Sequence, residues 1–158
     1  MSTSTVDTSQ DVEDILKVHH AWVQSNDGLI IEDMIPNFAD PGYLQYNLNG
    51  HTYRSVHEKV KLWEGLLGAG LNLTDMQVVE EPEVYVEGGL AYLTAIWSCY
   101  TVGQGSSGNM EMSGAPITFR ITEVYRKDDG KGNPVWKIWH FHCSLVADPS
   151  SPKYPQDA

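Results

Sequence analysis

Two histidines in one short segment are the first residues whose types and spacing could do chemistry. Residues 135–146, VWKIWHFHCSLV, are rich in β-formers, and residues two apart in a strand share a face. His140 and His142 therefore belong with Trp136 and Ile138 on one face. Two imidazoles on a largely apolar face could form a proton-transfer pair or supply two metal ligands. The spacing alone leaves both open.

A carboxylate stands among apolar side chains in the segment before it. In residues 117–127, ITFRITEVYRK, Glu123 shares a face with Ile121 and Tyr125, whereas Arg120 lies on the other face. An ionised carboxylate is costly to bury, so Glu123 should find a partner or keep its proton. It either reaches water at the end of the sheet, or serves as an acid or hydrogen-bond donor in a dry cleft.

A third candidate lies near the amino terminus. Residues 9–24 have the apolar spacing of an amphipathic helix, and its stripe includes Ile15, Trp22 and Val23. His19 falls inside that stripe. A histidine on an apolar helical face is either a core residue with satisfied hydrogen bonds or a group that faces a cleft, and the sequence leaves both readings open.

The elements that must position these residues change type along the chain. Helical patterns cover 9–24, 29–38 and 55–68, the last with Ser55 and Glu58 set as a capping box. β-Rich segments follow at 75–87, 90–102, 115–127 and 135–146, and a short one lies earlier at 42–48. The glycine- and serine-rich residues 102–113 predict a long hairpin loop or a mobile lid. Helices followed by an antiparallel meander predict an α+β fold.

Length and composition narrow the functional classes. The 158 residues fit one domain, with a globular part at about 9–147 and disordered tails at both ends. A net charge of −11 argues against nucleic acid and anionic membranes as partners. The chain shows neither a signal peptide nor a spanning segment, and its two cysteines are too few for a disulfide framework, so we expect a cytoplasmic protein with free thiols.

The closing segments resemble a known superfamily. RITEVYRKDDG followed by VWKIWHFHCS is similar to the final hairpin of the nuclear transport factor 2-like superfamily, especially its SnoaL-like domains and the association domain of calcium/calmodulin-dependent kinase. The upstream FADPGYLQYNLNGHTYRSVHEKVKLWEGL is similar to the family's strand, loop and third helix. The resemblance covers residues 10–147.

The resemblance implies a conical α+β fold, in which a curved antiparallel sheet wraps over three N-terminal helices and encloses one deep pocket. Trp136, Ile138, His140 and His142 would face that pocket, with Trp22 and Trp97 among its walls. Val135, Trp139 and Phe141 would pack on the convex side. Family members usually pair through this convex face, so a homodimer is expected.

The resemblance to ketosteroid isomerase also suggests roles for single residues. His19 matches the oxyanion-hole tyrosine, Glu123 the protonated carboxylic acid, and Tyr46 the catalytic base. A neutral phenol cannot replace a carboxylate base, which argues against steroid isomerisation. We expect His142, His140, Glu123, Tyr46 and His19 to form the site. The expected substrate-binding residues are Trp22, Trp97, Arg120, Trp136 and Ile138.

Three functional hypotheses follow. The favoured one is a cofactor-independent enzyme that moves protons on an apolar, aromatic or polycyclic small molecule, as an isomerase, cyclase, dehydratase or carbon–carbon lyase. The alternative is a ligand-binding or association module without chemistry. The third reading takes His140, His142 and Glu123 as a two-histidine, one-carboxylate metal site, although the resemblance points to pockets that hold no metal.

Overall fold

A computed structural model describes residues 6–104, 110–112 and 114–157. The helices are α1 (Ser9–Asn26), α2 (Ile31–Met34) and α3 (Val56–Gly68), with short 3-10 helices η1 (Ile35–Asn37) and η2 (Pro155–Asp157). The strands are β1 (Leu44–Tyr46), β2 (Thr52–Tyr53), β3 (Asn72–Glu87), β4 (Leu90–Gln104), β5 (Met110–Met112), β6 (Ile117–Lys127) and β7 (Trp136–Leu145). Within these described ranges, no helix is long and apolar enough to cross a membrane.

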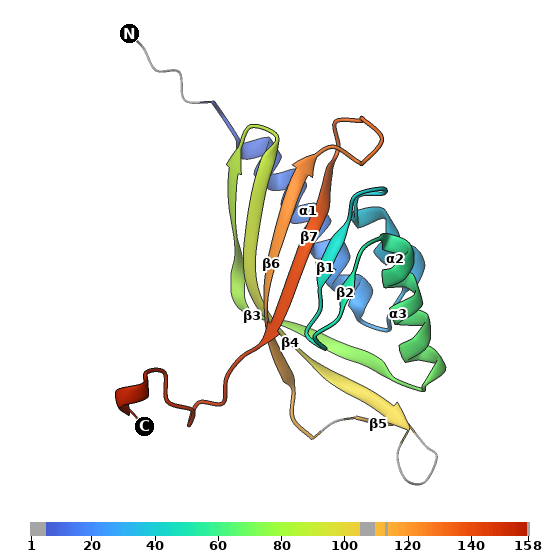
Figure 1. Cartoon of the computed structure of the whole chain (residues 1–158), viewed down its shortest axis with the longest axis vertical. Helices are drawn as coiled ribbons and strands as arrows, with labels where there is room; N and C mark the ends of the chain where they lie inside the picture. The colour runs from blue at the N-terminus through green and yellow to red at the C-terminus, as the bar shows by residue number, and fades with distance from the viewer. Residues whose placement is uncertain (1–5, 105–109, 113, 158) are drawn as a thin grey trace.

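One face of the sheet is covered by helices, and the α+β prediction is confirmed (Figure 1). The strand order is β2-β1-β7-β6-β4-β3, with β5 paired to β4. Every pair is antiparallel except β1 and β7, which run parallel. The expected meander accounts for β3, β4, β6 and β7. The parallel pair joins strands from opposite ends of the chain, so no hairpin sets its direction.

Helix boundaries follow the local sequence signals. The Ser55 hydroxyl accepts the backbone N–H of Glu58 at 3.1 Å, which confirms the predicted cap of α3. α3 ends at Gly68, the predicted stop. On α1 the buried side is formed by Ile15, His19, Trp22 and Val23, as the apolar spacing indicates. This side packs against the sheet, so α1 and the sheet share one core.

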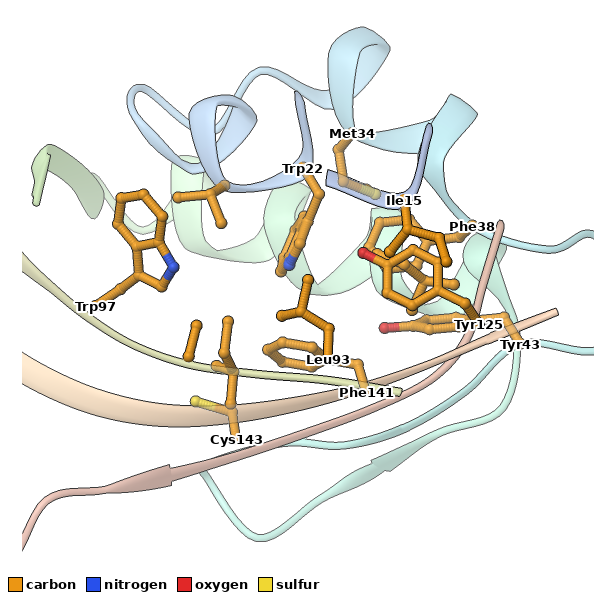
Figure 2. Packing of buried hydrophobic residues seen from close by; sticks show 14 of the residues in the cluster. Ile15, Trp22, Met34, Phe38, Tyr43, Leu93, Trp97, Tyr125, Phe141 and Cys143 are labelled. Atoms are coloured by element: carbon orange, nitrogen blue, oxygen red, sulfur yellow. The ribbon is translucent and has the colours of Figure 1, made fainter. Parts of the chain in front are cut away.

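The core lies between the helices and the inner face of the sheet. Figure 2 shows the rings of Trp22, Tyr43, Tyr125 and Phe141 gathered there. Trp22 contacts Phe141 edge to face, with ring centroids 5.3 Å apart. These aromatic contacts join α1 to strands from the far end of the chain and hold the site described below.

A one-residue bulge interrupts the pairing of β6 with β7. Tyr125 lies opposite Ile138, but Val124 lies opposite His140, so Trp139 is the extra residue. A bulge of one residue exchanges the two faces of the strand from that point on. Trp136 and Ile138 before the bulge point inward, and so do Phe141 and Cys143 after it. The prediction that Phe141 packs on the convex side is therefore wrong.

Contacts of Trp139 account for the bulge. Its ring lies so close to Gly42 that a Cβ there would stand 2.3 Å from a ring carbon. Its Nε1 donates to the Asp128 carbonyl at 2.8 Å, and the Arg126 guanidinium lies 3.9 Å from the ring centroid. These three contacts hold the indole outside the core. Gly42, at φ +121°, is therefore needed both for its backbone conformation and for its missing side chain.

The predicted loop or lid at 102–113 remains a prediction. Residues 105–109 and 113 lie outside the described residues, whereas β5 within this connection pairs with β4.

Candidate functional site

His140 and His142 lie on the outer face of the sheet. Residues directly opposite in a sheet share a face, and His142 lies opposite the outward Thr122, whereas Glu123 lies opposite the buried Phe141. The prediction that the two histidines face the inner pocket with Glu123 is wrong, because the bulge at Trp139 reverses the alternation. The proposed triad of two histidines and Glu123 cannot assemble across the sheet, and the described residues contain no cluster suited to a metal ion.

Tyr46 and Arg120 belong to the same outer surface. The Tyr46 ring lies 5.1 Å from the His140 ring and 5.7 Å from the His142 ring. Arg120 donates to the Ser144 hydroxyl at 3.0 Å and borders an open groove of about 720 Å³ together with His142. Tyr46 and Arg120 are therefore separated from the inner cavity by the sheet, contrary to the sequence-based expectation.

His19 and Glu123 do come together, in a fully buried network. His19 Nδ1 lies 2.9 Å from Glu123 Oε2, and the Tyr125 hydroxyl donates to the same oxygen at 2.5 Å. The Trp97 indole N–H donates to His19 Nε2 at 3.2 Å. An indole nitrogen can only donate, so Nε2 is the acceptor and Nδ1 carries the proton that is donated to Glu123. His19 is thus a core histidine with both ring nitrogens satisfied.

An apolar cavity of about 400 Å³ lies between α1, α3 and the inner sheet face. Its walls come mainly from apolar side chains of α1, α3, β4, β6 and β7, and Asn26, Gln45 and Asn47 are among its few polar groups. Of the predicted substrate-binding residues, Trp22 lines this cavity. Trp97, Trp136 and Ile138 are instead buried in the core, where the Trp136 indole donates to Asp11 at 2.9 Å.

The cavity floor contains an amine that the sequence analysis did not identify. Lys59 contributes to the cavity wall, yet its side chain is fully shielded from water. Its amino group therefore lies just beneath the lining rings, 4.2 Å from the Trp22 ring centroid and 5.3 Å from that of Phe141. Burial lowers the pKa of Lys59 from 10.5 to about 7. The amine therefore changes between its charged and its neutral form near neutral pH.

One amide oxygen organises the polar part of the floor. Lys59 Nζ donates to Gln45 Oε1 at 2.7 Å, and the Tyr43 hydroxyl donates to the same oxygen at 2.6 Å. Gln45 Nε2 donates in turn to Asn47 at 2.8 Å. Among the described residues, no carboxylate lies within salt-bridge distance of Lys59. The amine therefore has one hydrogen-bond acceptor and otherwise faces aromatic rings.

A sequence signal for Lys59 existed. It occupies the buried stripe of α3 together with Val56 and Trp63, at spacings of three and four residues. A lysine inside such a stripe is unusual, because lysine is almost never fully buried without a partner. Gln45 offers a weaker signal, as a polar residue in the middle of the three-residue strand β1.

The two free thiols in the cavity wall are not nucleophiles at neutral pH. Burial raises the pKa of Cys143 to about 12, with a smaller opposing effect from the nearby Lys59, and burial also raises the pKa of Cys99. Because the thiolate is the reactive form, both side chains act as apolar wall groups. Among the described residues that line this cavity, Lys59 is therefore the side chain that can act as a base or nucleophile near neutral pH.

The fold is shared with many solved structures. A nuclear transport factor 2-like superfamily protein from Salmonella enterica serovar Typhimurium is 18% identical, with a TM-score of 0.73 and 94% of this chain and 99% of that one covered. A ketosteroid isomerase-like protein from Erwinia carotovora is 13% identical, with a TM-score of 0.70 and coverages of 89% and 99%. The association domain of CaMKII from C. elegans is 15% identical, with a TM-score of 0.57 and coverages of 87% and 99%.

These likenesses define an α+β protein of the nuclear transport factor 2-like fold with an internal cavity. The model of the SnoaL-like domain family matches residues 7–142, and the chain belongs to that family. No curated protein sequence matches the chain.

Proposed function

We propose that this SnoaL-like protein is a cofactor-independent enzyme that moves a proton on a small, largely apolar molecule bound in the inner cavity. The cavity walls suit a ring-containing substrate, because they are mainly aliphatic and aromatic. Isomerisation, aldol-type cyclisation, dehydration and carbon–carbon cleavage can each be started by a proton transfer between the substrate and a positioned side chain.

The observation that carries the proposal is the buried amine of Lys59 at the cavity floor, which forms no ion pair with any carboxylate of the described residues. Burying an amine lowers its affinity for protons and costs stability, so a purely structural role would be served better by an apolar side chain. Groups whose pKa lies near the working pH are the most effective general bases. Lys59 meets this condition inside the apolar core between the helices and the sheet.

Lys59 acts as the base in this proposal. Its neutral form accepts a proton from a substrate carbon, and the ammonium ion formed is stabilised by the Gln45 oxygen and the faces of the Trp22 and Phe141 rings. The buried network of His19 and Glu123 does not line the cavity. We propose that these two residues position α1 against β6. Because Trp22 belongs to α1, they also position the Trp22 ring that lies over the amine.

The test is the pH dependence of kcat/KM, measured on a substrate found by native mass spectrometry of copurifying molecules or from a panel of aromatic ketones. The rate should rise with pH through a single ionisation near 7, because only the neutral amine accepts a proton. Lys59→Met should lower kcat/KM at least about 100-fold and remove this limb. Lys61→Met, an exposed neighbour on α3, is the matched control. Full activity of Lys59→Met would refute the proposal.

We also propose that the outer sheet face pairs two copies of the chain. This face exposes the large apolar side chains of Tyr85, Leu90 and Tyr92, which lie next to one another on β3 and β4. A contiguous patch of this kind usually marks an interaction surface. A solution mass of twice 17.6 kDa supports a dimeric enzyme. A ring of ten or more copies would favour the alternative, an association module, whose fold is also represented among the similar structures.

A further inference from the structure

We propose that Lys59 forms a covalent imine with hydrophobic aldehydes or ketones that enter the inner cavity. The inference rests on the proposed function. It adds a substrate class, namely apolar carbonyl compounds, and it gives the same amine a second mode of action as a nucleophile.

The placement of the amine favours nucleophilic attack. Lys59 Nζ gives one hydrogen bond, to Gln45 Oε1 at 2.7 Å, and no carboxylate in the described part of the chain holds it as an ion pair. A lysine desolvated in an apolar pocket is the usual form of an imine-forming lysine, because the neutral amine keeps its lone pair free. Around Lys59 the other titratable groups are the Cys143 thiol, the Tyr43 phenol and, at longer range, Glu123.

The cavity selects the carbonyl compound. The side chain of Lys59 is fully buried, so a reactant reaches Nζ only from the cavity floor and only when the covering rings of Trp22, Trp63 and Phe141 move apart. Flat apolar molecules pack on such rings. A sulfonate para to the aldehyde would lose its hydration against apolar walls, because Lys59, the cation of the described lining, stands at the opposite, carbonyl end of the molecule.

The step is balanced without any further reactant. The lone pair of Nζ attacks the carbonyl carbon, and the π electrons of the C=O bond move to oxygen. A proton passes from nitrogen to that oxygen, which gives a carbinolamine. The carbinolamine hydroxyl then takes up a second proton, the C–O bond breaks and water leaves, and the nitrogen gives up its remaining proton as the C=N bond forms, so that no net proton is gained or lost. The Tyr43 hydroxyl shares the acceptor Gln45 Oε1 with Lys59 Nζ, but burial raises the pKa of Tyr43 well above its ordinary value, so the protons pass between the nitrogen and oxygen of the carbinolamine rather than from this phenol.

Reductive trapping tests the inference on the full-length protein. The protein is incubated at pH 7 with benzaldehyde and sodium cyanoborohydride, which reduces an imine to a stable secondary amine, and the modified lysines are mapped by peptide mass spectrometry. Lys61 and Lys131, which are exposed, are the reference lysines for the rate of modification. Lys59 should be modified at least 10-fold faster than either, and 4-formylbenzenesulfonate should not label it.

The outcomes separate the two proposals. Preferential labelling of Lys59 in the wild-type protein supports imine formation. The peptide that contains residue 59 should lose its label in Lys59→Met, and Lys59 should keep its label in Lys61→Met. Because the main result comes from the wild-type protein, it does not depend on whether a variant folds. Binding of benzaldehyde in the cavity can be followed by quenching of the tryptophan fluorescence. If Lys59 is labelled no faster than Lys61, imine formation is refuted, whether or not this quenching shows that benzaldehyde binds. The role of Lys59 as base would then still be judged by the pH dependence of kcat/KM. If the rise of kcat/KM with pH near 7 also persists in Lys59→Met, both proposals fail.

Discussion

Replacing Lys59 by Met should raise the free energy of unfolding by about 2 to 4 kcal/mol at pH 6. The wild-type chain must bury an ammonium ion at this pH. Lowering the pKa of Lys59 from 10.5 to about 7 corresponds to a cost on the order of 5 kcal/mol, at about 1.36 kcal/mol for each pH unit. Met keeps most of the side-chain volume and removes the charge. It also removes one hydrogen bond, although Gln45 Oε1 still accepts from Tyr43, and the gain is reduced accordingly.

The same substitution should change how stability depends on pH. Between about pH 7 and 10.5 the unfolded chain binds a proton at Lys59 that the folded chain has lost, so wild-type stability rises with pH in this window. Below about pH 7 the folded and the unfolded chain both bind this proton, and the full free-energy cost of burying the ammonium ion is present. The advantage of Lys59→Met should therefore shrink by about 2 kcal/mol between pH 7 and 8.5.

Urea unfolding of both variants between pH 6 and 8.5 measures this difference. The upper limit matters, because burial raises the pKa of Cys99 and Cys143 and makes the folded state less stable with rising pH above about 8.5. Taking the difference between the two variants largely cancels these thiols. An advantage of Lys59→Met that stays constant across the window would show that Lys59 keeps an ordinary pKa in the folded protein.

Glu123→Ala should destabilise the fold by about 3 to 5 kcal/mol. The substitution leaves the Nδ1–H of His19 and the hydroxyl of Tyr125 without their acceptor, and both lie in the buried core. Glu123→Gln keeps an acceptor oxygen at this position and should cost less, about 1 to 2 kcal/mol. Glu83→Ala, which removes an exposed carboxylate from β3, is the matched control and should change stability by less than about 0.5 kcal/mol.

Thermal and urea unfolding of these three variants distinguish a structural network from a dispensable one. If Glu123→Ala were as stable as Glu83→Ala, the contacts of Glu123 would not hold α1 against the sheet. A loss of turnover in Glu123→Gln without any change in stability would instead return Glu123 to the catalytic machinery, the role that the sequence first suggests for it.

The helices and long strands are predictable because their signals are local. The stripe of α1 and the cap at Ser55 are properties of neighbouring residues, and they remain true in the folded chain. The pairing of His19 with Glu123 agrees with the position of each on an apolar face, although the sequence could not distinguish a satisfied core network from a catalytic pair.

The orientation of His140 and His142 is not predictable in this way. Alternation along β7 assumes an uninterrupted strand, and one extra residue at Trp139 reverses it. That bulge depends on the contact of Trp139 with Gly42, a residue from a distant part of the chain. The role of Lys59 was missed for a different reason: a lysine on a helix is usually solvated, and only the packing of Trp22 and Phe141 over its amine shows otherwise.

The most direct test of the account is the protonation of Lys59 itself. The chemical shift of its Cε carbon can be followed by ¹³C NMR from pH 5.5 to 10 in protein labelled at lysine, with the signal assigned by its absence in Lys59→Met. The account predicts a midpoint near 7 for this signal, well below the usual range of a lysine amine. A midpoint above about 9.5 for Lys59 would contradict the account, because the amine would then be protonated at neutral pH and could act neither as a base nor as a nucleophile.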